Sequence, residues 1–137
     1  MTSREAIASI WTEVAATVVE QVASEGATAS SGLAGVVARA YGEDIQSTFP
    51  IAVEAMTLDD GPERAAKLDA LASAIRGVSE RHHVPRLVER GLVAVAFGVA
   101  SGLIRRRAPS CGFTPEALDV EMSRFRDEVE SRLFALR

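Results

Sequence analysis

Apolar positions along the first quarter of the chain repeat every three or four residues. Thr2 and Glu5 have the spacing of a helix-capping box, and the apolar repeat that follows continues until Gly26. A repeat of this period places one apolar stripe along a helix. The pattern therefore predicts a helix over residues 3–24, with Trp11 on its inner face.

The next stretch is less regular and contains a proline. Ser30 or Ser31 can cap a short helix, which Gly42 ends or bends. Proline is best tolerated in the first turn of a helix, so Pro50 places a helix start near Thr48. We expect this helix either to begin there or to be a kinked continuation of the previous one.

Two clear helices follow a break at residues 59–62. Asp60 and Glu63 repeat the capping arrangement, and the helix they open is expected to run to about Arg81. Pro85 marks the start of the next helix, which ends near Arg106, because the residue before a proline avoids helical geometry. The apolar stripe of the first of these two helices consists of Leu68, Leu71, Ile75 and Val78.

The helix after Pro85 carries the most apolar segment of the chain. Residues 92–104 contain no charge and are apolar or small on every side, which is typical of a buried helix covered from several directions. This length is below the roughly 18 residues that mark a membrane span, so we expect no membrane segment. Gly98 and Gly102 form a G-x-x-x-G spacing, which indicates close helix packing. The stripe expected to face one neighbour consists of Val88, Leu92, Val95, Val99 and Leu103.

The last helix has the strongest boundary signals. Thr114 can cap it and Pro115 suits its first turn. Ion pairs from Glu128 to Arg124 and to Arg132 are predicted on its solvated face. Its apolar stripe consists of Leu118, Met122, Phe125, Val129, Leu133 and Leu136. The whole pattern predicts an all-α fold in one domain, residues 1–137.

Composition and charge narrow the function without naming it. A chain of 137 residues with 47% hydrophobic content can bury a core of its own. The net charge of -4 disfavours binding to nucleic acid. The single cysteine, Cys111, cannot form an internal disulfide, and no signal peptide is evident, so a cytoplasmic location is expected.

The chain carries no sequence motif of a phosphate-binding loop, a dinucleotide site or a zinc protease, so we expect no catalytic residue and no enzyme. His82 and His83 are its only histidines and are adjacent, and such residues point about 100° apart on a helix. A shared metal site is therefore not expected. The pair either ends the preceding helix at its negative pole or supplies one imidazole to haem iron.

Three segments of the second half carry a resemblance to known proteins. The helix ending ERHH, the V-P turn with the apolar helix Leu87 to Ile104, and the F-T-P-E opening at Phe113 to Glu116 resemble the last helices of the globin fold. The segments IWTEVAATVVEQ and VVARAYGED are similar to haem-free, globin-like sensor domains of bacterial stress-signalling complexes. The resemblance implies a single globin-like bundle of about five to seven helices.

The resemblance implies a non-catalytic sensory or regulatory domain in bacterial signal transduction, without a cofactor. It implies a homodimer with a protein signalling partner, acting through helix rearrangement. The alternative that it leaves open is a haem globin for a diatomic gas, with His83 as proximal ligand and Val53, Met56 and Phe97 as pocket walls. A second register places Ser79 at the proximal position instead, and serine cannot replace an imidazole ligand.

Overall fold

The computed structural model describes residues 2–12 and 40–136, and every regular element in these two ranges is a helix. The predicted all-α class is confirmed for this part of the chain. Residues 13–24 of the first predicted helix and the caps at Ser30 or Ser31 lie outside the described residues. The elements are helical residues 3–12 and 40–45, η1 (Gln46–Thr48), α3 (Phe49–Thr57), α4 (Pro62–Arg81), α5 (Arg86–Arg107), η2 (Ala108–Cys111) and α6 (Pro115–Ala135).

Two of the predicted helix caps are confirmed. The Thr2 hydroxyl accepts a hydrogen bond from the Glu5 N–H at 3.1 Å, and the Thr114 hydroxyl accepts one from the Ala117 N–H at 3.2 Å. Each bond satisfies a donor that the first turn of a helix leaves without a partner. Pro50 lies in the first turn of α3, as its missing N–H requires.

Two boundary predictions were wrong. Helical residues continue past Gly42 to residue 45, and η1 then joins them to α3, so this glycine does not end the helix and the chain stays helical up to α3. Asp60 does not cap α4, because Gly61 is the N-cap residue and makes no side-chain cap. The Asp60 carboxylate instead accepts a hydrogen bond from Arg124 of α6.

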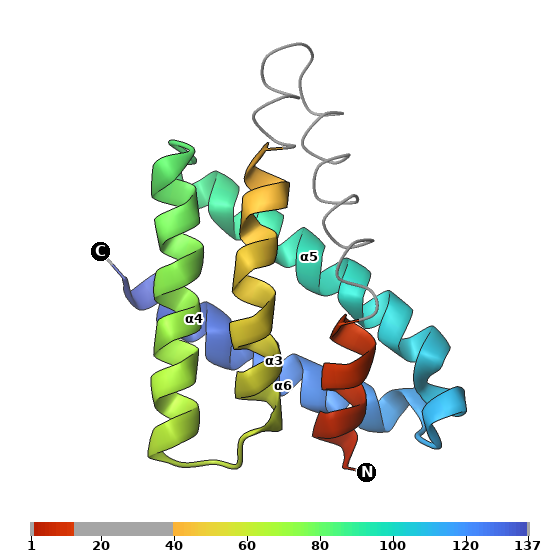
Figure 1. Cartoon of the computed structure of the whole chain (residues 1–137). Coiled ribbons are helices and arrows are strands. Elements are labelled where there is room, and N and C mark those ends of the chain that lie inside the picture. The colour runs from red at the N-terminus through yellow and green to blue at the C-terminus, as the bar shows by residue number, and fades with distance from the viewer. Residues whose placement is uncertain (1, 13–39, 137) are drawn as a thin grey trace.

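The helices form two crossing layers. Figure 1 shows α3 and α4 running antiparallel, with helical residues 3–12 beside the lower half of α3 and with α5 and α6 crossing behind them. Residues 58–61 form the short connection that keeps α3 and α4 adjacent. α4 also packs on α6, and α6 packs on α5, so α4 and α6 join the two layers.

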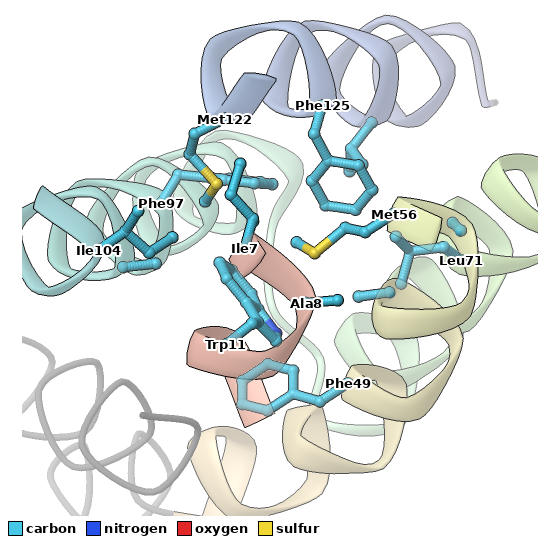
Figure 2. Packing of buried hydrophobic residues seen from close by; sticks show 14 of the residues in the cluster. Ile7, Ala8, Trp11, Phe49, Met56, Leu71, Phe97, Ile104, Met122 and Phe125 are labelled. Carbon is cyan, nitrogen blue, oxygen red and sulfur yellow. The ribbon is translucent and has the colours of Figure 1, made fainter. Parts of the chain in front are cut away.

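The hydrophobic core lies between these layers. Figure 2 shows Trp11 among side chains from α3, α4, α5 and α6, in one contiguous cluster. The inward orientation predicted for Trp11 is confirmed, because only 4% of its surface is exposed. The stripe predicted for α6 is confirmed at Leu118, Met122, Phe125, Val129 and Leu133, while Leu136 is half-buried.

α5 differs from its prediction in two respects. It is not buried on all sides: only 28% of its most apolar window is buried, and Leu87 is 81% exposed. The stripe that it does bury is Glu89, Val93, Phe97, Ala100 and Ile104 rather than the one expected from Val88 onwards. When a helix is apolar on every side, its sequence does not indicate which side is buried. The buried side of α5 carries Phe97, and it also carries Glu89, whose charge is paired with Arg76 of α4.

The glycines of α5 do not bring a second helix close in the part of the chain that the structure describes. A Cβ atom added at Gly91 or Gly98 would meet nothing within 4 Å, and one at Gly102 would meet only Arg106 of the same helix, at 3.9 Å. The tight packing predicted from the G-x-x-x-G spacing is therefore wrong for the described residues.

Candidate functional site

Three of the four pocket residues predicted from the sequence lie in or against the core. Met56 and Phe97 belong to the buried cluster, and Val53 packs against it from a half-buried position. Of the four predicted residues, only Phe97 lines the apolar cavity described below. His83 lies on the exposed end of α4, outside this cluster.

The backbone explains the position of His83. Its φ angle of 55° is left-handed, its N–H donates to the Glu80 carbonyl at 3.2 Å, and the Val84 N–H donates to the Ser79 carbonyl at 2.8 Å. These two bonds make a Schellman motif, the usual way of ending a helix, with His83 in the position that glycine prefers. The histidine pair thus ends α4, through backbone geometry.

His82 belongs to a small polar group beside that helix end. Its Nε2 lies 3.0 Å from the Asp44 carboxylate, and Arg81 donates to the same oxygen at 3.1 Å. The hydrogen bond with His82, helped by Arg81, lowers the pKa of Asp44. The Tyr41 ring stands edge-on to His82 at 5.9 Å between centroids. This group fastens helical residues 40–45 to the end of α4.

An apolar cavity of about 50 Å³ lies inside the bundle beside Trp11. Almost all of its wall is hydrocarbon, and helical residues 3–12 and 40–45, η1 and α3 to α6 all contribute to it. In residues 2–12 and 40–136, its lining consists of Trp11, Tyr41, Ile45, Thr48, Phe49, Ala52, Leu71, Ile75, Leu92, Val93, Ala96, Phe97, Phe125 and Val129.

The indole of Trp11 carries an unusual feature. Its Nε1 is buried and has no hydrogen-bond partner among the described residues. Phe49 stands edge-to-face with the indole at 5.7 Å between centroids, and Phe97 lies at 5.8 Å on another side. Figure 2 shows the indole nitrogen at the end of the ring nearest Phe49. A buried donor without an acceptor costs about 1–3 kcal/mol, and such a group in a native protein needs an explanation.

The residues around this cavity do not fit haem with His83 as its ligand. His83 is exposed and does not line the cavity, so its imidazole has no path to an iron atom held there. The cavity is also several times smaller than the roughly 300 Å³ at which pockets for cofactors begin. We therefore derive no chemistry through haem.

Two buried arginines of α4 were not predicted as functional or structural groups. Arg76 donates to both carboxylate oxygens of Glu89 on α5, at 3.0–3.2 Å, and to the carbonyls of Leu133 and Leu136 at the end of α6. Arg64 donates to both carboxylate oxygens of Glu128 on α6, at 2.7–3.0 Å. It also donates to the carbonyls of Ala55 and Leu58 at the end of α3.

The sequence held a signal for these charges. Arg64 lies four residues before Leu68 on the apolar stripe of α4, and Glu89 lies four residues before Val93 on the buried stripe of α5. A charge at a stripe position faces the core, and a buried charge has to find a partner there. The predicted solvated pair of Glu128 and Arg124 forms at 3.7 Å, but the stronger partner of Glu128 is the buried Arg64.

The outer face of α5 is an exposed surface of small and apolar residues. It is defined here by the exposed Leu87, Gly91, Ala94 and Gly98, which follow one another at helical spacing. Arginines stand at both ends of this outer face. By length and composition, the segment Arg86–Cys111 is the one described segment that passes a test for crossing a membrane, a test that the core helices of soluble proteins also pass.

Residues 2–12 and 40–136 contain no cluster of three or more histidine, cysteine, aspartate or glutamate side chains that could hold a metal ion. Comparisons of the chain with models of protein families, with curated proteins and with solved structures give no match. We therefore infer a function from the geometry of the described residues.

Proposed function

We propose that this chain is a non-catalytic regulatory helical domain that docks a helix of another protein on the outer face of α5. The observation that carries the proposal is the exposure of that face, because an apolar surface without cover is typical of an interaction site. Its small residues leave the α5 backbone accessible, so a partner helix can approach closely.

The charges around the outer face indicate the chemistry of the partner. Arg86 and Arg90 lie at one end and Arg105 and Arg106 at the other, about 25 Å away along the helix. Of these four, only Arg105 pairs with a carboxylate among the described residues, Asp119 at 3.3 Å. A partner helix with aspartate or glutamate at both ends and small apolar residues between them complements this face.

The same charges argue against pairing of two α5 helices. An antiparallel pair would bring Arg86 and Arg90 of one copy against Arg105 and Arg106 of the other, and a parallel pair would bring each group against itself. Like charges placed together disfavour an interface. We therefore propose that the homodimer implied by the resemblance uses a different surface.

The buried side of α5 supplies a route for a signal. Glu89 joins α5 to Arg76 of α4, and the same guanidinium holds the last carbonyls of α6. A shift of α5 on docking would therefore strain contacts to both neighbouring helices at one point. This arrangement supports regulation by helix rearrangement.

The proposal is tested by selecting binders from a displayed library of helical segments on the immobilised whole chain. We expect the selected helices to carry small apolar stripes with acidic ends, and their affinity to fall at least about tenfold for Ala94→Glu, which adds bulk and like charge. Arg86→Glu and Arg106→Glu should each weaken binding. Ala70→Glu, on an exposed site of α4, is the matched control.

Four outcomes would contradict the proposal. The first is selection of neutral or basic helices from the library, and the second is an unchanged affinity of the selected helices for the Ala94→Glu variant. Third, anionic lipid vesicles that bind the unchanged chain but not the Ala94→Glu variant would make the outer face a membrane contact. Fourth, sedimentation equilibrium that shows a dimer for the unchanged chain and a monomer for Ala94→Glu would mean that the outer face binds a second copy of the chain.

We further propose the finer features that the resemblance implies: a single globin-like domain, haem-free and cytoplasmic, in bacterial signalling. The crossing of two helix layers supports the globin-like detail. Hemin titration tests the haem alternative, since a Soret band that is lost in His83→Ala would support it. Sedimentation equilibrium tests the homodimer, which a monomer at every concentration would exclude.

A further inference from the structure

We infer that the cavity beside Trp11 binds a compact apolar molecule carrying one oxygen acceptor, such as a small ketone or ether, whose oxygen accepts the hydrogen bond of the indole N–H. Two independent observations point to this site: the cavity itself, and, on a residue that lines it, a buried donor that has no partner among the described residues. A ligand in this cavity would give the regulatory domain a second molecule to respond to. The binding site does not depend on the proposed docking of a partner on α5.

Water is a poor occupant of this cavity. A buried water needs two to four polar partners, whereas apolar cavities stay dry. Among the described residues, the side chains that line the cavity and carry polar groups are Trp11, Tyr41 and Thr48. The Tyr41 hydroxyl is bonded to Ser79 at 3.1 Å, and the Thr48 hydroxyl donates to the Ile45 carbonyl at 2.7 Å. One indole N–H and a hydrocarbon wall suit a molecule with a single acceptor and an apolar body.

The size of the cavity links binding to movement of the helices. A cavity of about 150 Å³ holds the six carbons of benzene, so 50 Å³ holds about two heavy atoms. Even the best ligands of two atoms bind more weakly than about 1 mM. A ligand that binds more tightly must be larger and must push the lining outward. Because the described helices share this lining, an occupied cavity displaces them together.

The chain contains one tryptophan, so its indole N–H gives a single, assignable signal in a nitrogen–proton NMR spectrum. The test titrates the whole chain with acetone and with isobutene, which has the same shape and no oxygen. We expect acetone to move the indole proton signal downfield, with saturation in the millimolar range, because a hydrogen bond deshields the proton. Isobutene should not move it downfield.

Filling the cavity provides a matched pair of variants. Ala52→Val adds two carbons inside the cavity, about the volume available, and should weaken the acetone response at least about tenfold. Ala70→Val adds the same atoms on the exposed side of α4 and should leave the response unchanged.

The inference is overturned if acetone gives no saturable shift, if isobutene gives the same downfield shift, or if Ala52→Val responds like the unchanged chain. The comparison of the two probes needs no variant, so it stands even where Ala52→Val fails to fold. An acetone response without any selected helix binder would remove the proposed docking function alone, and the reverse result would remove only this site.

Discussion

Arg64 and Arg76 perform the same task at opposite ends of α4, about 18 Å apart along the helix. Each guanidinium binds the carbonyl of the C-cap residue of another helix and the carbonyl three residues before it: Ala55 and Leu58 of α3 for Arg64, Leu133 and Leu136 of α6 for Arg76. The last carbonyls of a helix have no partner within it. Each arginine therefore supplies donors and positive charge where a helix end needs both.

The two sites differ in the burial of the carboxylate. Glu89, the partner of Arg76, is 1% exposed, whereas the side chain of Glu128, the partner of Arg64, is 22% exposed. The difference lies in the carboxylates and not in the arginines, because the side chain of Arg76 is 10% exposed and that of Arg64 is 4% exposed. Water can take the place of the half-buried Glu128, but it cannot take the place of the fully buried Glu89. The same hydrogen-bond pattern therefore produces a rigid joint where the carboxylate is buried and a softer joint where the carboxylate meets water.

Glu89→Ala should produce the largest loss. It leaves the buried Arg76 without a countercharge, and the free energy of unfolding should fall by about 3–5 kcal/mol. Urea denaturation followed by circular dichroism measures this loss. Glu80→Ala, at an exposed position of α4, is the control and should change stability by less than about 0.5 kcal/mol. A loss below 1 kcal/mol at Glu89 would mean that Arg76 finds water in the folded chain.

Glu128→Ala should cost less, about 1–2 kcal/mol in the same measurement. Arg64 keeps its bonds to Ala55 and Leu58, and water replaces part of the lost carboxylate. Equal losses at Glu128 and Glu89 would show that burial of the carboxylate does not distinguish the two sites.

The Arg76 end should also respond to alkaline pH through Tyr41. Burial raises the pKa of Tyr41 above its usual value of 10.0; the hydrogen bond to Ser79 lowers it, and Glu89 raises it. The stabilisation is present below pH 10 and is lost as the pH rises through the folded-state pKa. Tyrosinate absorbance reports the titration directly, because the chain has one tyrosine. Tyr41→Phe should remove this part of the alkaline instability, and a normal midpoint in the folded chain would contradict the expectation.

The smallest effect is expected at the Arg64 end in acid. The hydrogen bond from Arg124 lowers the pKa of the exposed Asp60, with a smaller contribution from Arg64. The stabilisation is present above the usual pKa of 3.8 and is lost as the pH falls through the folded-state value. Asp60→Asn should reduce the loss of stability at acid pH. Added salt should reduce the difference in acid stability between the variant and the unchanged chain. An unchanged acid limb would show that the pair contributes nothing.

Local signals predicted much of the fold, and long-range contacts account for the rest. The caps at Thr2 and Thr114 depend on residues three positions apart, so the sequence alone locates them. Asp60 has the same local pattern, but Arg124, 64 residues away, takes its carboxylate. A rule based on residue spacing along one helix cannot predict that an arginine of another helix binds the same carboxylate.

The candidate site was predicted less well, for two reasons. Phe97 was correctly predicted to line a pocket. The cavity itself is the small space left where seven segments pack together, and no sequence pattern predicts its volume. The outer face of α5 was expected to be buried, because composition alone does not distinguish a helix inside a core from one exposed along one side. The exposed side becomes visible only when its neighbours are placed.

The bonds from Arg76 to Leu133 and Leu136 have a consequence for the dynamics of α6. Helix ends ordinarily fray, and their amide protons exchange with solvent through local opening at little free-energy cost. Here the final turn cannot unwind without releasing a guanidinium whose countercharge is buried on another helix. The amide protons of that turn should therefore exchange as slowly as those of the core, so that this helix opens only when the whole bundle does.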